Sequence, residues 1–253
     1  MPDPVRDLNT ESSDFVTRFS ASSKTDLLLG TLDMEDGHDY NAALLLSGAT
    51  QQMQIYRKVH LVPFGEYIPL RHSFPLFAAV AGKWVPGDFD PGRDYTVFRL
   101  TNSDVRVAPL ICFEDTIGDL VRQFVLRGAG LLVDVTNDAW FLRSAGSRQH
   151  LANAIFRCVE TRRPMVRAAN TGVTCFVNEL GRVTQLLQDE TGSTFTEGVL
   201  TGEIKVPTGG ELTFYTRHGE LFAKLCAWIT LVAIGASILQ LLWRKRGRTG
   251  DGR

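Results

Sequence analysis

The sequence has few cysteines and almost no net charge. Four cysteines in 253 residues lack the density of a disulfide-rich scaffold, and none forms the C-x-x-C pair typical of zinc or redox sites. We therefore expect no metal ligands. The 27 Lys and Arg residues balance 28 Asp and Glu residues, which leaves a net charge of −1. This balance removes the basic footprint of a protein whose main partner is nucleic acid.

Several motifs of common enzyme classes are also missing. The sequence contains no G-x-G-x-x-G, no G-x-x-x-x-G-K-[ST], no G-x-S-x-G and no H-E-x-x-H. The sequence therefore gives no evidence for a kinase, a Rossmann dehydrogenase, a serine hydrolase with a nucleophile elbow or a zincin protease. The composition, with 44% hydrophobic and 22% charged residues, is nevertheless that of a folded protein.

One long apolar run stands near the C-terminus. Residues 221–243 contain a single charge, Lys224, and as a helix they would be about 35 Å long, enough to cross roughly 30 Å of hydrocarbon. A buried core helix is the alternative, but such helices seldom stay apolar on every face for so many turns. Residues 244–253 form a basic tail, so the positive-inside rule predicts a cytoplasmic C-terminus and places residues 1–215 on the outer face.

No signal peptide precedes this domain. Residues 1–23 have neither a basic n-region nor an apolar h-region. Because a domain cannot reach the outer face on a C-terminal anchor without a tail-first route or earlier membrane spans, we expect the chain to be incomplete at its N-terminus.

Residues 25–205 alternate between short apolar runs and amphipathic stretches, which indicates a mixed α/β domain. Helical spacing of apolar residues predicts helices at 116–127, with Gly128 as the stop, and at 146–162. Proline and glycine predict a long irregular loop at 70–94. Strands are expected at 26–32, 41–47, 53–58, 95–100, 105–111, 131–136, 165–169 and 173–177.

Cys112 lies where an apolar strand ends and an acidic stretch that begins a helix follows. Backbone N–H groups at such a turn stabilise a thiolate and can also bind an oxyanion, so this position suits a nucleophile. The alternative is a small buried hydrophobe, because free cysteine is among the most buried residue types. We assign that role to Cys158, Cys175 and Cys226, whose sequence neighbours offer nothing to activate a thiol.

A second cluster contains a lysine at the end of a strand and a glutamate eight residues later. Lys58 and Glu66 are separated by a Pro-Phe-Gly turn. A lysine in a partly dry site can stabilise the oxyanion of a tetrahedral intermediate, and a nearby carboxylate can orient it or shuttle protons. Surface charges are the simpler explanation for this pair, and the spacing alone does not exclude it.

Three motifs that follow one another along the chain are similar to those of a known family: Lys58-x-His-Leu-Val-Pro-Phe-Gly-Glu66, Ile-Cys112-Phe-Glu114, and Thr-Asn-Asp-Ala-Trp140-Phe. The chain resembles the apolipoprotein N-acyltransferases, whose nitrilase-like (carbon–nitrogen hydrolase) domain lies on the outer face of the bacterial inner membrane before the last of several transmembrane helices. Further matching segments are Gln149-His150, Glu160, Arg162-Arg163-Pro164 and Arg167-Ala-Ala-Asn-Thr-Gly172.

The resemblance implies a nitrilase-like α-β-β-α sandwich over residues 1–215, followed by one C-terminal transmembrane helix. It implies acyl transfer of the Glu-Lys-Cys type, in which a phospholipid ester donates its acyl chain to Cys112 and the N-terminal cysteine amine of an apolipoprotein then receives it. The resemblance implies no metal and no cofactor for this reaction. Lys58 becomes the triad lysine, Glu66 and Glu114 supporting carboxylates, and the Phe113 N–H an oxyanion donor. Trp140 becomes a substrate-binding residue.

Two departures from the family pattern bear on activity. Many members have tyrosine where Phe113 stands, and we expect only a modest effect from the lost phenol. The triad glutamate of the family lies in a Pro-Glu motif before a segment similar to residues 2–7, so the general base is missing from this sequence. Glu11, the nearest glutamate, follows that segment and is a poor candidate.

Two other functions remain open. A membrane-tethered nitrilase-type amidase would use the same chemistry with water in place of the lipoprotein amine. A catalytically inactive nitrilase-like module that binds a partner would agree with the missing glutamate. The anchor and the apolar residues of the long loop favour a lipid donor over a soluble amide. Those loop residues are Phe74, Leu76, Phe77, Val80 and Trp84. Acyl chain preference, lipoprotein clients and oligomeric state are not determined by the sequence.

Overall fold

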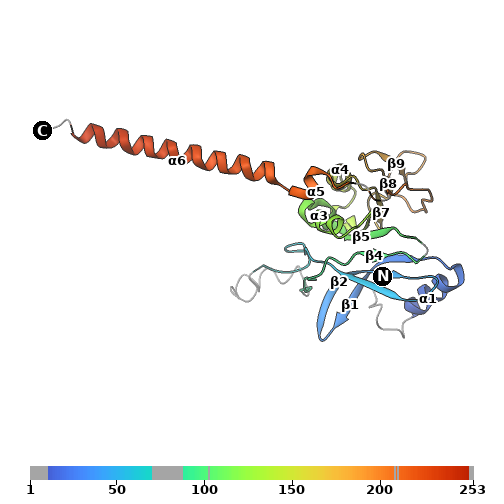
Figure 1. Cartoon of the computed structure of the whole chain (residues 1–253). Helices are drawn as coiled ribbons and strands as arrows, with labels where there is room; N and C mark the ends of the chain where they lie inside the picture. The colour runs from blue at the N-terminus through green and yellow to red at the C-terminus, as the bar shows by residue number, and fades with distance from the viewer. Residues whose placement is uncertain (1–10, 70–87, 102, 208, 210, 251–253) are drawn as a thin grey trace.

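Two β-sheets face each other in the computed structural model, with helices on their outer sides (Figure 1). The structure describes residues 11–69, 88–101, 103–207, 209 and 211–250. The first helix, α1 (Glu11–Ser23), lies beside the first sheet, whereas α3 (Gly118–Leu126) and α4 (Gly146–Thr161) cover the second. The expected α-β-β-α sandwich is therefore confirmed.

The first sheet is antiparallel and contains three strands in sequence order. Its strands are β1 (Leu27–Glu35), β2 (His38–Leu46) and β3 (Met53–Arg57). Strands β1 and β2 pair from Leu27↔Leu46 to Glu35↔His38 around a two-residue turn, Asp36-Gly37. Both turn residues have positive φ, +52° and +81°, as Asp-Gly hairpin turns require. This turn explains why both strands extend further than expected.

The second sheet has six strands in the order β4-β5-β6-β7-β8-β9. Its three central strands are parallel, which places their carboxyl ends at one edge of the sheet. The strands are β4 (Phe98–Arg99), β5 (Arg106–Ile111), β6 (Leu131–Thr136), β7 (Met165–Ala169), β8 (Cys175–Val177) and β9 (Val183–Leu186). Two 3-10 turns follow the first two parallel strands: η1 (Cys112–Thr116) after β5 and η2 (Asp138–Phe141) after β6.

The hydrophobic core fills the space between the sheets and under α3 and α4. Strand β5 is buried from Val107 to Ile111, because one face meets the first sheet and the other meets the helices. The Phe124 ring of α3 packs edge to face on Tyr56 of β3, with 5.3 Å between the ring centroids. This packing fixes the end of β3, and with it the residues that follow, against the helical layer.

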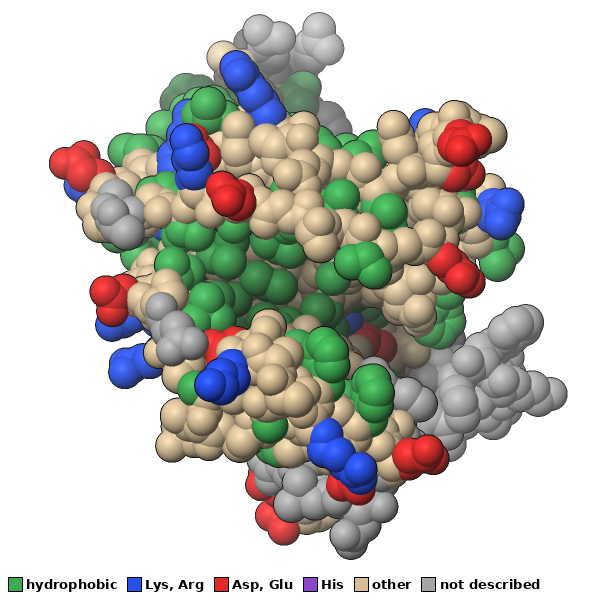
Figure 2. Space-filling view, turned by 90° about the vertical axis from the view of Figure 1, so that its right-hand side faces the viewer, with side chains coloured by type: hydrophobic (Ala, Val, Ile, Leu, Met, Phe, Trp, Pro, Cys, Tyr) green, Lys and Arg blue, Asp and Glu red, His purple; other side chains and the backbone are tan. Residues whose placement is uncertain are grey.

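On the face seen in Figure 2, charged side chains of both signs are scattered rather than gathered. Hydrophobic side chains line a hollow on the same face. No single-sign patch is visible there, in keeping with the balanced charge of the chain.

A long helix leaves the domain at its C-terminal end. Helix α5 (Phe214–His218) packs on α3 and α4, and α6 (Leu221–Gly250) projects away from the sandwich (Figure 1). Within α6, residues Leu221–Leu241 have a mean hydropathy of 1.9, and none of this stretch is buried in the protein. One helix long and apolar enough to cross a membrane is therefore present in the described chain, at the position that the sequence predicted.

The secondary structure departs from expectation at a few places. Strand β4 covers only two residues of the expected 95–100, and β9 and α5 were not expected. Helix α3 begins at Gly118 and ends before Gly128, whose φ of +95° confirms it as the stop. The loop expected at 70–94, with its five apolar residues, falls largely in 70–87, outside the described residues.

Candidate active site

Cys112 occupies a strained position at the end of β5. Its φ is +53°, a left-handed conformation that side-chain-bearing residues adopt rarely, and it is the first residue of η1. The Phe113 side chain next to it is exposed, at 41%. This sharp change from strand to turn holds the thiol, which is half-buried, at the carboxyl edge of the parallel strands.

Glu114 anchors this turn from inside. Its carboxylate is fully buried and accepts a hydrogen bond from the Ile111 N–H at 3.0 Å, which closes the first turn of η1 on itself. The Tyr56 hydroxyl donates to the same carboxylate at 2.7 Å. Burial raises the pKa of Glu114, although these donors and the nearby Lys58 charge oppose the shift. The structure thus places Glu114 as a support of the turn, not as a group on its surface.

Lys58 and Glu66 form a buried ion pair. The Lys58 Nζ donates to both carboxylate oxygens, at 2.9 and 2.8 Å, and the lysine side chain has no exposed surface. The Asn41 side-chain amide and the Val62 N–H donate to the same carboxylate, at 2.6 and 2.8 Å. The two residues are therefore not the surface charges that their spacing alone would suggest.

Backbone contacts join the cysteine turn to the lysine segment. The Glu114 Oε1 accepts from the Val59 N–H at 2.9 Å and from the His60 N–H at 3.1 Å, immediately after Lys58. The rings of His60 and Phe113 lie 6.3 Å apart, centroid to centroid. Four of the expected site residues, Lys58, Glu66, Phe113 and Glu114, thus belong to one connected region around Cys112.

Trp140 lies on the neighbouring turn. Since β5 and β6 are adjacent and parallel, with Ile111 opposite Val135, the turns η1 and η2 begin at the same sheet edge. The Asn137 side chain caps η2 by accepting from the Ala139 N–H at 3.2 Å. The Trp140 side chain is 74% exposed.

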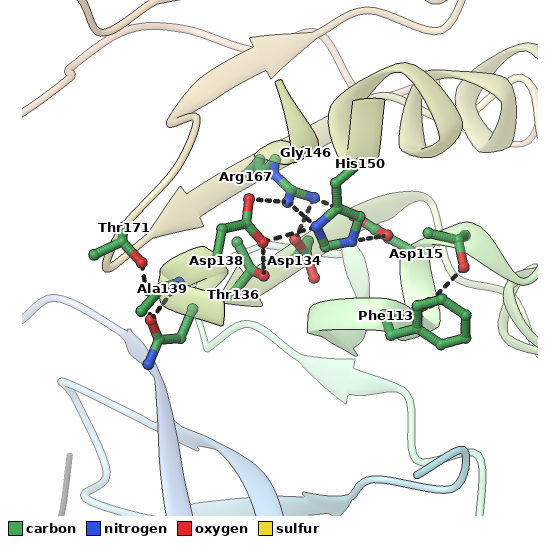
Figure 3. A network of polar contacts seen from close by, with 12 residues as sticks. Phe113, Asp115, Asp134, Thr136, Asp138, Ala139, Gly146, His150, Arg167 and Thr171 are labelled. Atoms are coloured by element: carbon green, nitrogen blue, oxygen red, sulfur yellow. Dashed lines mark hydrogen bonds and ion pairs between the residues drawn. The ribbon is translucent and has the colours of Figure 1, made fainter. Parts of the chain in front are cut away.

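A buried network beneath these two turns was not predicted from the sequence. It contains Asp115 of η1, Asp134 of β6, Asp138 of η2, His150 of α4 and Arg167 of β7 (Figure 3). Each of these residues is at most 6% exposed. A signal was available in the sequence, because charged residues interrupt two apolar strands, Leu-Leu-Val-Asp134 and Met-Val-Arg167.

The electrostatics of the network depend on its cations. Burial opposes a charge on His150, but hydrogen bonds to Asp115 and Asp138 outweigh it and raise the pKa of His150 to about 10. Burial and the Asp115 charge raise the pKa of Asp134 well above its usual range. For Asp138, burial acts upward, yet the His150 and Arg167 contacts hold its pKa below the usual value.

The other cysteines lie in different environments. Cys158 and Cys175 are fully buried, and burial raises the pKa of their thiols to about 12 and about 11. Cys226 is exposed on α6. Among the residues that the structure describes, no group of three or more His, Cys, Asp or Glu side chains is arranged to hold a metal ion.

Comparisons with known proteins agree with this fold and identify the family. A family model described as carbon-nitrogen hydrolase matches residues 5–213. The chain is 39% identical to an apolipoprotein N-acyltransferase of Geobacter metallireducens over 81% of the chain, and 40% identical to one of Chlorobaculum tepidum over 79%. These alignments cover 36% and 37% of the relatives, so the chain spans about a third of their length.

Among solved structures, a carbon-nitrogen hydrolase from Helicobacter pylori superimposes with a TM-score of 0.55 at 14% identity, over 71% of this chain and 64% of that one. At this identity the likeness supports the fold alone. The expected resemblance to apolipoprotein N-acyltransferases is confirmed by the two relatives above.

Proposed function

The chain belongs to the carbon-nitrogen hydrolase family, and we propose that it provides the catalytic domain of an apolipoprotein N-acyltransferase. The observation that carries the proposal is the 39–40% identity to two such enzymes across a region that contains Cys112 and its supporting residues. The strained backbone of Cys112 is the second support, because residues in sparsely populated conformations cluster at active sites.

The proposed reaction has two half-reactions on the Cys112 thiol. In the first, a base takes the thiol proton, the thiolate attacks the ester carbonyl of a phospholipid, and the lysophospholipid leaves as an alcohol after receiving a proton. In the second, the α-amine of the diacylglyceryl-cysteine at the N-terminus of an apolipoprotein attacks the thioester. An amide forms, the carbon–sulfur bond breaks, and the proton lost by the amine passes to the base or to the released thiolate, which restores Cys112 for the next cycle.

Oxyanions form in both half-reactions and need positive partners. We assign this role to the Phe113 N–H and the Lys58 ammonium. Glu66 holds Lys58 in place through its two hydrogen bonds, and Glu114 holds the turn. Because both carboxylates already receive several donors, we assign neither as the base that takes the thiol proton. Trp140 is the proposed contact for the acyl donor, since its large apolar side chain is exposed beside the site.

The proposed location follows from α6. We place the apolar part of this helix, Leu221–Leu241, across the bacterial inner membrane, with the catalytic domain on the outer, periplasmic face and the basic residues that follow this part in the cytoplasm. Both proposed substrates carry acyl chains and are held in the bilayer. A domain anchored to the same bilayer meets them without their leaving it.

Trapping the thioester tests the proposal. The 253-residue chain in detergent micelles is incubated with phosphatidylethanolamine at pH 9, where the buffer takes the thiol proton in place of the glutamate that the sequence lacks, and its intact mass is measured with and without hydroxylamine. An increase by one fatty acyl group that maps to Cys112, is removed by hydroxylamine and passes to a synthetic diacylglyceryl-cysteine peptide is expected. The matched controls are Cys112→Ala, which should stay unmodified, and Cys158→Ala, which should react like the parent chain.

Other results would point to the two alternative functions. Release of ammonia from small amides, with no acyl group gained from phospholipid, would identify an amidase. The catalytically inactive binding module would be supported if neither substrate gave an adduct and if Cys112 reacted no faster with iodoacetamide than buried Cys158.

A further inference from the structure

One histidine lies between the two turns of the candidate site. Its Nε2 is 2.8 Å from the Oδ1 of Asp115, which is three residues after Cys112 in η1. Its Nδ1 is 2.8 Å from the Oδ1 of Asp138, the first residue of η2. Figure 3 shows His150 reaching down from α4 to both carboxylates. The side chain therefore connects the turn that carries the thiol to the turn that carries Trp140.

Arg167 joins the same two turns from the other side. Its guanidinium, which projects from β7, forms ion pairs with Asp115, with Asp134 at 2.8 Å and with Asp138 at 3.3 Å. Asp138 is further held by the hydrogen bond that the Thr136 hydroxyl donates at 3.2 Å. With no exposed surface on these aspartate side chains, water does not compete for the bonds.

The contacts of His150 determine its protonation state. An ionised carboxylate only accepts hydrogen bonds, so a ring with a carboxylate oxygen at each nitrogen must donate from both. The ring is then an imidazolium. The Nη2 of Arg167 lies 2.9 Å from Nδ1, and in this state the two nitrogens are both donors that share the Asp138 carboxylate. Burial and the Asp115 charge raise the pKa of Asp134, which lessens the excess of negative charge around the two cations.

We propose that His150 is a positioning residue which, as an imidazolium held between Asp115 and Asp138, fixes the Cys112 turn relative to the Trp140 turn. The inference rests on the proposed function of Cys112. A backbone at φ +53° persists only where its surroundings hold it, and Asp115 is the residue of η1 on which His150 and Arg167 converge. His150 acts through Asp115 on the thiol and on the Phe113 N–H.

This role differs from that of a catalytic histidine. A general base needs a free lone pair within reach of the thiol, and both nitrogens of His150 are occupied by carboxylates. Substituting His150 should therefore misplace the nucleophile without removing a proton acceptor.

Alkylation of Cys112 measures the position of the turn. In a Cys226→Ser background, the full chain in micelles is treated with iodoacetamide at pH 7.5, and the labelling rate of each cysteine is followed by peptide mass. We expect His150→Gln to slow Cys112 alkylation about tenfold. His38→Gln is the matched control, because His38 also lies 2.9 Å from an aspartate, Asp90, but on the exposed surface of the first sheet. Its rate should equal that of the parent.

A double-mutant cycle tests whether the effect passes through Asp115. Asp115→Asn should slow alkylation about as much as His150→Gln, and the double variant should be no slower than either. Protection of buried Cys158 and Cys175 in the same samples reports that each variant is folded. The proposal would be overturned if Cys112 of a folded His150→Gln sample, with Cys158 and Cys175 protected, were alkylated within twofold of the parent rate. The route through Asp115 would be overturned if the slowing in the double variant were the product of the slowing in the two single variants.

A spectroscopic measurement reports the protonation state of His150 in the parent chain. In a chain with ¹⁵N-labelled histidine, both ring nitrogens of His150 should show imidazolium shifts at pH 8; His150→Gln serves only for assignment. A neutral His150 ring at pH 8 would overturn the proposal, even if the substituted chains unfold. Failure of the proposed function looks different, because parent Cys112 would then react as slowly as Cys158 while the imidazolium shifts remain.

Discussion

Lys58 and Glu66 form an ion pair inside the domain in which the lysine contacts both carboxylate oxygens, with Nζ at 2.9 Å from Oε1 and 2.8 Å from Oε2. The lysine is 1% exposed and the glutamate 9%. Such a pair is sensitive to the loss of one partner, because the other charge then stays buried without compensation.

Glu66→Ala should therefore destabilise the domain by about 3 kcal/mol, within the range for breaking a buried pair. Urea unfolding monitored by circular dichroism measures this change. The matched control is Asp14→Ala, which breaks an exposed pair with Arg18 in α1 and should cost less than about 0.5 kcal/mol. Equal losses in the two variants would mean that Lys58 reaches water when Glu66 is absent.

The backbone of Cys112 predicts an unusual order of stability. Because its φ is +53°, Cys112→Gly should be more stable than Cys112→Ala by about 1 kcal/mol. Cys158 in α4 is the matched position, where alanine should be the more stable by about 1 kcal/mol. Thermal unfolding of the four variants makes the comparison, and the same order at both positions would contradict the left-handed conformation of Cys112.

Gly172 packs directly on the buried network. Its φ is +113°, and a Cβ there would overlap Asp138. Gly37 is the control for backbone strain without overlap, because its φ is +81° and a Cβ there would have nothing within 4 Å. Gly37→Ala should cost about 1 kcal/mol, and Gly172→Ala clearly more. Urea unfolding gives both values. Only Gly172→Ala should also slow alkylation of Cys112.

The charge of His150 predicts a loss of stability in alkaline solution. Its pKa is raised from 6.5 in the unfolded chain to about 10 in the fold, so the folded state retains a proton over this range. The contribution is complete below pH 6.5 and declines as the pH rises toward 10. Asp115, Asp134, Asp138 and Arg167 face the ring, and Cys175 faces Arg167 from β8.

Comparing the parent chain with His150→Gln isolates this contribution from the other groups that titrate. The difference between their free energies of unfolding should be larger at pH 6 than at pH 9.5. A difference that does not change with pH would show that His150 is neutral throughout.

The proposed orientation of α6 places residue 253 in the cytoplasm. A green fluorescent protein fused after residue 253 should fluoresce in an Escherichia-type host, because that reporter matures in the cytoplasm and not after export by the general secretion route. An alkaline phosphatase fused at the same point should stay inactive, and activity there would reverse the proposed orientation.

Most of the sandwich could be predicted from residue patterns. Apolar runs located the strands well wherever both faces are buried, as in β5 and β6, and Gly128 located the end of α3. Short elements gave no such signal. Strand β9 is largely exposed, so its residues show no burial pattern, and α5 has only five residues, too few for helical periodicity.

In the candidate site, too, some residues could be predicted from the sequence and others could not. Cys112 was proposed from its place at the end of an apolar strand, and Lys58 and Glu66 were added because their order along the chain matches a family. The Asp115, His150 and Arg167 network was not, because its members come from separate elements and meet only in the fold. Pairing of charges distant in sequence depends on sheet register and helix placement, which composition and periodicity do not encode.

The connection between α5 and α6 consists of two residues, Gly219 and Glu220. Helix α5 is held on the domain through Thr216, which is fully buried, and through Thr213, whose hydroxyl donates to the Glu160 carbonyl at 2.5 Å. A connection of two residues restricts the rotation of the domain relative to α6. In the proposed placement of α6 across a bilayer, this connection would set the height and tilt of the Cys112 turn above the lipid surface, and encounter with a substrate in the same membrane would be a search by lateral diffusion in two dimensions.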